Sequence, residues 1–195
     1  MIKGGIDIEL REIILEGTIK VFNEKGLKFT MDDVAKTLGM SKKTIYTVFS
    51  NKESMFYTMV DYMFDRIKES EQRIVEDETL STPEKIRQIM SVMPESYRNV
   101  NFHQLYQLKD KYPAVYKQVE KRLETGWEET IRLLEQGMAE GCIRKVHIPL
   151  VKMMLEASLE QFFQRDILIR NKITYVDALN EVVEIILDGI SVHDE

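Results

Sequence analysis

Residues 30–49 contain two short helical patterns that are separated only by a Gly-Met-Ser link at positions 39–41. Thr30 and Ser41 each precede one of the two patterns, and both are residue types that favour the N-cap position of a helix. Gly39 follows the first pattern and takes the left-handed conformation, which often ends a helix, without a steric cost. Because the link is so short, the second helix must cross the first at a steep angle, as it does in a helix-turn-helix.

The two sides of the predicted helices carry different kinds of residue. Apolar residues at helical spacing form one side, and they are expected to pack into one small core: Val34, Ala35, Leu38, Met40 and Ile45. The second helix must then expose its other side, which carries long cations and short hydroxyls: Lys42, Lys43, Thr44 and Thr47. Such groups bind phosphate oxygens and base edges. The pattern therefore predicts a recognition helix that begins near Lys42 and enters the major groove of DNA.

The remainder of the chain is also predicted to be helical. Only nine Gly and four Pro interrupt the 195 residues, and apolar residues recur three or four positions apart through most of the sequence. A capping box at 50–53 starts a long helix that ends near Val75. Thr82, followed by a proline, starts another helix, and a single long helix carries apolar residues from Val115 to Met138. We expect an all-α fold of about nine helices with no β-strand.

A polar segment at 76–81 divides the predicted helices into two regions. Residues 1–54 are expected to form a DNA-binding domain of three helices, the first of which begins at Ile8. A linking helix at 51–76 continues this domain. Residues 77–195 are expected to form a second, C-terminal helical domain, so the sequence predicts two domains that share one long helix.

Composition excludes several classes of protein. The single cysteine, Cys142, rules out an internal disulfide framework and a Cys-based zinc site, and the three histidines are too far apart in sequence to suggest a metal site. No apolar run approaches the roughly 20 residues that span a bilayer. The N-terminal sequence MIKGGIDIELRE has no apolar signal-peptide core. We therefore expect a cytoplasmic protein with no cofactor, no metal and no membrane association.

Charge is distributed unevenly along the chain. The formal net charge is −6, which argues against indiscriminate binding to nucleic acid. Residues 1–52 nevertheless carry nine Lys or Arg against seven Asp or Glu, and Val34–Lys52 holds four lysines and no acid. A basic face on an acidic protein fits a local contact with DNA, although a lysine cluster is more often a solvated surface.

The helix-turn-helix and its flanks resemble the TetR family of bacterial regulators, the TetR/AcrR-like proteins. The resemblance rests on three runs that occur in the family's order: Thr30–Ala35, Leu38–Tyr46 and Phe49–Glu53. It extends over about residues 8–60. The rest of the chain matches the family only in being helical and of suitable length. The resemblance implies an all-α regulator with a C-terminal domain for ligand binding and dimerisation.

The candidate DNA-binding residues are Thr30, Ser41, Lys42, Lys43, Thr44, Tyr46, Thr47 and Lys52, and the resemblance implies roles for all of them except Ser41 and Thr47. Thr30 would contact a phosphate at a helix N-terminus, and Tyr46 and Lys52 would contact the DNA backbone, with core packing as the alternative for Tyr46. The first turn of the second helix would enter the groove. The family often has aromatic or His residues at the two positions after the tyrosine, where this chain has Thr47 and Val48. We therefore expect specificity to depend mainly on the first turn of the recognition helix.

The resemblance also implies how such a protein works. TetR-like proteins are homodimers that bind near-palindromic operators, mostly as repressors, and a small molecule bound in the C-terminal domain releases the DNA. The last two helices, at about 149–166 and 174–190, would form the dimer interface, unless they bury each other within the monomer. Plain core packing is the alternative for Trp127. The candidates for the ligand pocket are Met90, His103, Tyr106, Trp127 and Phe162.

Two other classes of function stay open on the sequence. An all-helical enzyme with an incidental helix-turn-helix is disfavoured, because the sequence lacks a paired His/Glu metal motif, a nucleophile motif and a Gly-rich phosphate loop. A helical adaptor that has lost DNA binding is favoured only by the departure at Thr47 and Val48. The sequence therefore predicts a transcription regulator that is not an enzyme. Its expected partners are double-stranded DNA, a second copy of the chain and a small-molecule effector.

Overall fold

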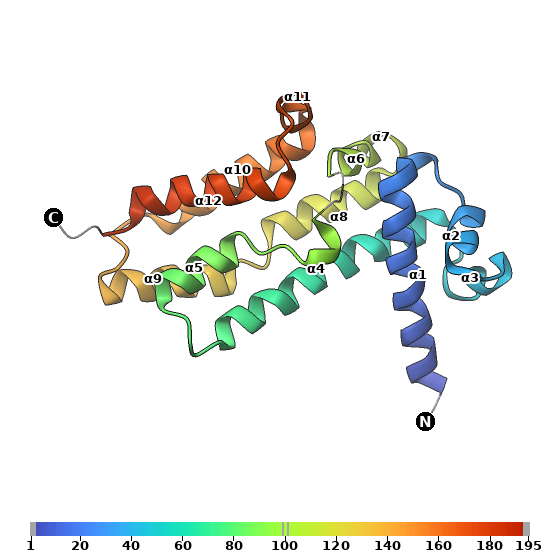
Figure 1. Cartoon of the computed structure of the whole chain (residues 1–195), viewed down its shortest axis with the longest axis horizontal. Helices are drawn as coiled ribbons and strands as arrows, with labels where there is room; N and C mark the ends of the chain where they lie inside the picture. The colour runs from blue at the N-terminus through green and yellow to red at the C-terminus, as the bar shows by residue number, and fades with distance from the viewer. Residues whose placement is uncertain (1–2, 99, 101, 193–195) are drawn as a thin grey trace. The chain divides into compact units, whose positions relative to one another are not determined.

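The computed structural model describes residues 3–98, 100 and 102–192 (Figure 1). Within these ranges the regular elements are helices, and the only β pairing is an isolated bridge between Ile143 and Ser191. The predicted all-α fold is therefore confirmed. The described residues form more helices than the nine or so that were expected, because some of the short helices and one helix break were not predicted.

Contacts within the chain divide it into two compact units. The first unit comprises Met1–Phe64 and Gln104–Glu120, and the second comprises Asp65–His103 and Lys121–Glu195. Helices α4 (Lys52–Glu76) and α8 (Pro113–Glu124) each contribute residues to both units. The expected functional division into a DNA-binding domain at 1–54 and a ligand-binding domain at 77–195 stays a prediction.

The first unit contains the helix-turn-helix. Besides parts of α4 and α8, its elements are α1 (Lys3–Lys25), the 3₁₀ turn η1 (Gly26–Lys28), α2 (Met31–Leu38), α3 (Lys42–Val48), most of α6 (His103–Tyr106) and α7 (Leu108–Lys111). α1 begins earlier than the expected Ile8 and packs against both α2 and α3. The rings of Phe22 and Phe29 each meet the ring of Phe56 edge to face, at centroid distances of 5.7 and 5.3 Å. This aromatic core joins α1 and the turn before α2 to the start of α4.

The second unit is a set of helices around one apolar core. Besides parts of α4 and α8, its elements are α5 (Thr82–Met90), the 3₁₀ turn η2 (Glu95–Tyr97), α9 (Glu128–Glu140), α10 (Ile148–Gln164), α11 (Ile167–Asn171) and α12 (Tyr175–Ile190). α5 packs against α9 and α12, and α10 and α12 lie side by side (Figure 1). Four helices each bring a side chain that is at most 1% exposed to this core: Ile86, Leu133, Leu155 and Val183.

Two predicted helix starts are wrong by one residue. α4 is capped by Asn51, whose Oδ1 accepts the N–H of Ser54 at 2.8 Å, rather than by the serine before it. α5 is capped by Ser81, whose N–H donates to Oε2 of Glu84 at 2.8 Å, rather than by Thr82. In both cases a neighbouring residue of the same capping type takes the position, so the helix itself is where the sequence predicts it.

The single long helix that was predicted from Val115 to Met138 is wrong. α8 ends at Glu124 and α9 begins at Glu128. Between them Gly126 has a φ of +82°, in the left-handed region that glycine adopts without steric cost. The chain therefore turns at this residue, and Trp127 becomes the N-cap residue of α9 instead of a residue in the middle of a helix.

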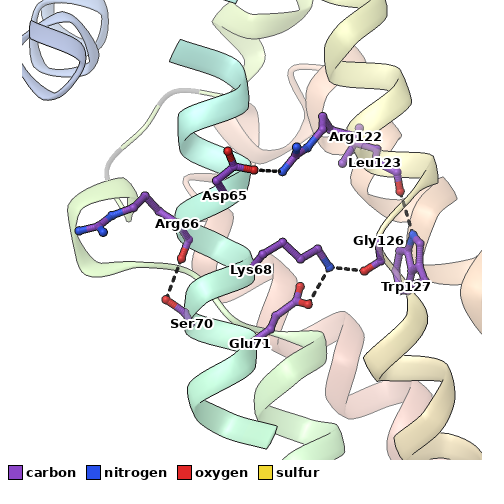
Figure 2. Close-up of polar contacts among 9 residues, drawn as sticks. All are labelled: Asp65, Arg66, Lys68, Ser70, Glu71, Arg122, Leu123, Gly126 and Trp127. Atoms are coloured by element: carbon purple, nitrogen blue, oxygen red, sulfur yellow. Dashed lines mark hydrogen bonds and ion pairs between the residues drawn. The ribbon is translucent and has the colours of Figure 1, made fainter. Parts of the chain in front are cut away.

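Side chains of α4 and of Trp127 hold this turn, as Figure 2 shows. The ammonium of Lys68 donates to the carbonyl oxygen of Gly126 and pairs with Glu71 at 2.6 Å. Glu71 is a buried carboxyl, and burial raises its pKa, against the hydrogen bond from Lys68. The indole Nε1 of Trp127 donates back to the carbonyl of Leu123 at 2.9 Å. The end of α8 is thus hydrogen-bonded from α4 and from its own chain.

Replacing Gly126 by alanine is expected to lower the free energy of unfolding more than the same change at Gly141. The two glycines have φ values of +82° and +81°, a conformation that costs an L residue about 1–2 kcal/mol. A Cβ at Gly126 would lie 2.7 Å from Cε of Lys68, whereas at Gly141 nothing lies within 4 Å. The alanine at Gly126 must therefore displace Lys68 from its hydrogen bond, which we expect to cost about 1 kcal/mol more.

Urea denaturation of the two variants measures this difference directly. In a Lys68→Met background the two glycine changes should cost the same, because the displaced side chain no longer makes the hydrogen bond. Equal losses at Gly126 and Gly141 in the parent background would contradict the role given to Lys68.

Candidate nucleic-acid interface

Local hydrogen bonds set the start of each helix of the motif. Oγ1 of Thr30 accepts the N–H of Asp33 at 3.2 Å, and the Asp33 carboxylate accepts the N–H of Thr30 at 2.8 Å. Gly39 ends α2 with a φ of +63°. Oγ of Ser41 accepts the N–H of Thr44 at 3.1 Å and so caps α3. The caps predicted for both helices are therefore confirmed.

Two carboxylates in the first turn of α2 bind lysines. The ammonium of Lys25 lies 2.6 Å from Asp33. This hydrogen bond, together with the one from the N–H of Thr30, lowers the pKa of Asp33 to about 2, so the carboxylate stays ionised well below neutral pH. Asp32 binds the ammonium of Lys42 at 2.9 Å, and this hydrogen bond raises the pKa of Lys42. The first residue of the predicted recognition helix is thus paired with α2 in the free chain.

α3 has one buried side and one exposed side. Ile45 is 0% exposed and Phe49, directly after the helix, is 2% exposed, and both lie in the core that α3 shares with α1 and α2. Val34 and Ala35 of α2 are buried as predicted, whereas the predicted core residues Leu38 and Met40 are only partly buried. The exposed residues of α3 are Lys42, Lys43, Tyr46 and Thr47.

The hydroxyls of this surface differ in the groups that they bind. Oγ1 of Thr44 lies 2.8 Å from Oγ of Ser41 at the start of α3. Oγ1 of Thr47 donates to the carbonyl of Thr44 at 2.6 Å, so its hydrogen is used within the helix. Tyr46 is 46% exposed, which argues against the alternative that it packs into the core. The roles of these residues in binding DNA stay predictions.

Two of the predicted phosphate contacts have their polar groups engaged within the protein. The hydroxyl of Thr30 donates to Oδ2 of Asp33 at 2.9 Å. The ammonium of Lys52 donates to the carbonyls of Leu27 and Phe29, on the turn before α2. These contacts hold both residues against the chain at the start of α2 and in the turn before it.

Arg11 of α1 is a residue of this surface that the sequence did not indicate. Its guanidinium carbon lies 5.3 Å from the ring centroid of Phe49, and Nη2 donates to Oγ1 of Thr58 at 3.2 Å. The contact brings a cation from α1 to the end of α3. In the sequence Arg11 has acidic neighbours that balance its charge, so the sequence gives no sign of a basic site there. Only the fold places Arg11 beside the end of α3.

The residues predicted to line a ligand pocket do not all fall in one unit. Met90 and Trp127 belong to the second unit, where Met90 is a buried core residue and Trp127 packs against the same core. Tyr106 belongs to the first unit, where its ring meets that of Tyr116 edge to face at 5.6 Å. Core packing therefore accounts for the environment of Met90 and Trp127, and their role in a pocket stays a prediction.

The other two pocket candidates lie in an aromatic cluster of the second unit. The rings of Phe102 and Phe163 each contact Tyr175, at centroid distances of 4.1 and 5.9 Å, and Phe162 meets Tyr175 edge to face. Burial raises the pKa of the Tyr175 hydroxyl. Nδ1 of His103 lies 3.0 Å from the carbonyl of Phe163. The cluster joins the segment before α6 to the end of α10 and the start of α12.

Two further properties of the described residues bear on the class of protein. In those ranges, no three side chains of His, Cys, Asp or Glu come together in a group that could hold a metal ion. None of the helices within them has both the length and the apolar character needed to cross a membrane.

The motif and the fold both match known regulators. Residues 14–58 match the family described as bacterial regulatory proteins, tetR family. Over 182 residues the chain is 26% identical to the HTH-type transcriptional regulator YvaF of Bacillus subtilis. This match covers 93% of this chain and 96% of that protein. The structure of a TetR-family regulator from Cytophaga hutchinsonii superposes with a TM-score of 0.72 at 21% identity, covering 96% of this chain and 98% of that one. The transcriptional regulator FadR of Bacillus subtilis, solved in complex with stearoyl-CoA, superposes with a TM-score of 0.61 at 19% identity, covering 93% and 99%.

The fold and the exposed α3 define a helix-turn-helix protein of the all-α class. More narrowly, residues 14–58 match the tetR family of bacterial regulatory proteins and most of the chain is similar to an HTH-type transcriptional regulator, which confirms the resemblance seen in the sequence. The matched family consists of regulatory proteins, and the absence of enzymatic activity in this chain stays a prediction.

Proposed function

We propose that this protein regulates transcription by binding a specific DNA sequence, with α3 as the recognition helix. The observation that carries the proposal is the exposed side of α3, which presents Lys42, Lys43 and Thr47 while Ile45 anchors the helix in the core. α3 has seven residues, so it is about 10 Å long at about 1.5 Å per residue. An α-helix with its side chains is about 10–12 Å across, and the major groove, which is about 12 Å wide, admits a helix of that diameter.

Each polar group on this side of α3 has a proposed role that suits its chemistry. Lys43, Thr44 and Thr47 face the base edges, because amines and hydroxyls bind the donors and acceptors of the major groove. Tyr46 contacts a phosphate from the flank of the helix. Lys42 exchanges Asp32 for a phosphate when DNA arrives, and since exposed ion pairs contribute little to stability, this exchange costs little.

A second copy of the chain is proposed to cover the apolar surface of α10 and α12. On α10, Leu150, Met153 and Met154 are 52%, 56% and 53% exposed, and their spacing places them on one side of the helix. On α12, which packs beside α10, Ile185 is 65% exposed. Large apolar side chains gathered in this way are typical of a protein interface. A two-fold dimer would present two copies of α3 to two half-sites of an operator.

We further propose that a small-molecule effector binds the second unit and releases the DNA, so that the protein acts as a repressor in the cytoplasm. The C-terminal domain at 77–195 would then sense the effector, and the domain at 1–54 would bind the operator. The related fold of FadR, solved with stearoyl-CoA, supports an effector site in proteins of this architecture. An effector shifts the equilibrium only through its different affinities for the DNA-binding and released states.

Selection of bound duplexes from a random pool, followed by footprinting, tests the proposed function. The expected result is one enriched sequence with two inverted half-sites, whose centres lie one or more helical turns of about 34–36 Å apart. A pool that shows no enrichment after repeated selection would contradict the proposal. Enrichment of a single half-site without symmetry would contradict the proposed dimer but not the recognition helix.

A further inference from the structure

Lys52 is the first residue of α4, yet its side chain extends back to the turn that precedes α2. Nζ donates to the carbonyl of Leu27 at 2.8 Å and also to the carbonyl of Phe29. Leu27 lies in η1, and Phe29 directly precedes the N-cap residue Thr30. A single ammonium group therefore joins the start of α4 to the backbone that leads into α2.

Two aromatic rings enclose the same ammonium. Nζ lies 4.0 Å from the ring centroid of Phe29 and 5.4 Å from that of Phe56. Phe29 is 1% exposed and Phe56 is 0% exposed, so this contact is part of the core of the first unit. Burial, with a smaller effect of the Lys111 ammonium, lowers the pKa of Lys52 to about 8. The charged form therefore still predominates at neutral pH, where it attracts both the carbonyls and the ring faces.

We infer that Lys52 is a positioning residue that ties the turn at 27–29 to the start of α4, and that it does not bind a phosphate. An ammonium has three donors, and two of them are used within the protein. A phosphate would have to draw Nζ away from two carbonyls and two rings. Because α3 lies between α2 and α4 in the chain, a tie that fixes the starts of both helices also fixes the orientation of α3. The inference rests on the proposed binding of DNA by α3.

The salt dependence of DNA binding distinguishes a positioning residue from a phosphate contact. Lys52→Met keeps the apolar stem and removes the ammonium. We expect the variant to bind the selected duplex about tenfold more weakly than the parent, with the same slope of log affinity against log salt concentration. The loss of a phosphate contact would instead reduce the magnitude of that slope by about 0.9. Lys42→Met is the matched control, because it removes the ammonium that is proposed to exchange Asp32 for a phosphate and should reduce the slope.

Chemical labelling of the parent chain tests the contacts of the Lys52 ammonium with the turn at 27–29, and it needs no variant. Reductive methylation followed by peptide mapping reports the reactivity of each lysine. Because the reagent attacks the neutral amine, the lowered pKa of Lys52 should bring its labelling in the free chain to a plateau at a lower pH than that of the exposed Lys43. Addition of the selected duplex should protect Lys43 and leave the rate at Lys52 unchanged.

The two measurements separate the possible outcomes. A reduced salt slope for Lys52→Met would overturn the inference, and so would labelling of Lys52 with the same pH dependence as Lys43 in the free chain, or protection of Lys52 by DNA. If Lys52→Met does not fold, the labelling of the parent decides alone. If the parent binds no duplex, the proposed function fails, while the labelling rates in the free chain still decide whether the tie exists.

Discussion

Replacing Lys43 and Thr44 together by alanine is expected to weaken operator binding by one to two orders of magnitude while the dimer stays intact. Both residues lie in the first turn of α3, where the cap formed by Ser41 fixes the helix start. A side chain that contacts a base edge contributes about 1–3 kcal/mol to binding. Fluorescence anisotropy with the selected duplex, at one fixed salt concentration, measures the loss.

A lysine outside the first unit provides the matched control. Lys145→Ala removes an exposed lysine of the second unit and should bind the duplex as the parent does. Thermal unfolding of each variant shows whether its fold is kept. If Lys43→Ala and Thr44→Ala each bind the operator as tightly as the parent, the assignment of α3 as the recognition helix is wrong.

The second large effect concerns the dimer. Met153→Glu combined with Ile185→Glu is expected to convert the chain from a dimer to a monomer. Met153 on α10 and Ile185 on α12 are 56% and 65% exposed in the single chain, so glutamates are tolerated in the monomer. In the proposed interface each carboxylate would be buried without a partner, and an unpaired buried charge is strongly destabilising.

Light scattering coupled to size exclusion measures the change in mass. Ile8→Glu makes a similar change at a 62% exposed residue of α1 and should leave the mass of the dimer unchanged. The monomer should also bind the two-half-site duplex far more weakly, because it presents a single α3. A parent that is itself monomeric, or a double variant that stays dimeric, would contradict the proposed interface.

The helix-turn-helix could be predicted from the sequence because its signals are local. The caps at Thr30 and Ser41 and the turn at Gly39 depend on residues within a few positions of one another. Their hydrogen bonds form in the same way whatever surrounds them. The exposed side of α3 then follows from the burial of Ile45, which fixes how the helix is rotated.

The break between α8 and α9 could not be predicted in the same way. Leu123, Trp127 and Ile131 are spaced by four residues across the break, so the apolar period continues through it. A glycine inside a helix costs only about 1 kcal/mol relative to alanine, so Gly126 by itself is a weak signal. The hydrogen bond from Lys68, which holds the turn, comes from a helix far away in the sequence.

The direction of a long side chain is likewise a property of the fold. The sequence places Lys52 beside the helix-turn-helix, and the resemblance to the TetR family assigned it to the DNA backbone. The carbonyls of Leu27 and Phe29 and the rings around them are brought to Lys52 only when α4 packs against the turn before α2. A four-carbon stem can reach either partner, so the packing of the first unit decides between them.

The specificity of DNA binding tests the central claim most directly. The affinity of the parent chain is measured for the selected duplex and for a duplex of the same composition with both half-sites scrambled, at the same physiological salt concentration. If α3 contacts base edges, the selected site should bind at least about a thousandfold more tightly, as specific sites do. Equal affinities for the two duplexes would contradict the account, because binding would then depend on the phosphate backbone alone.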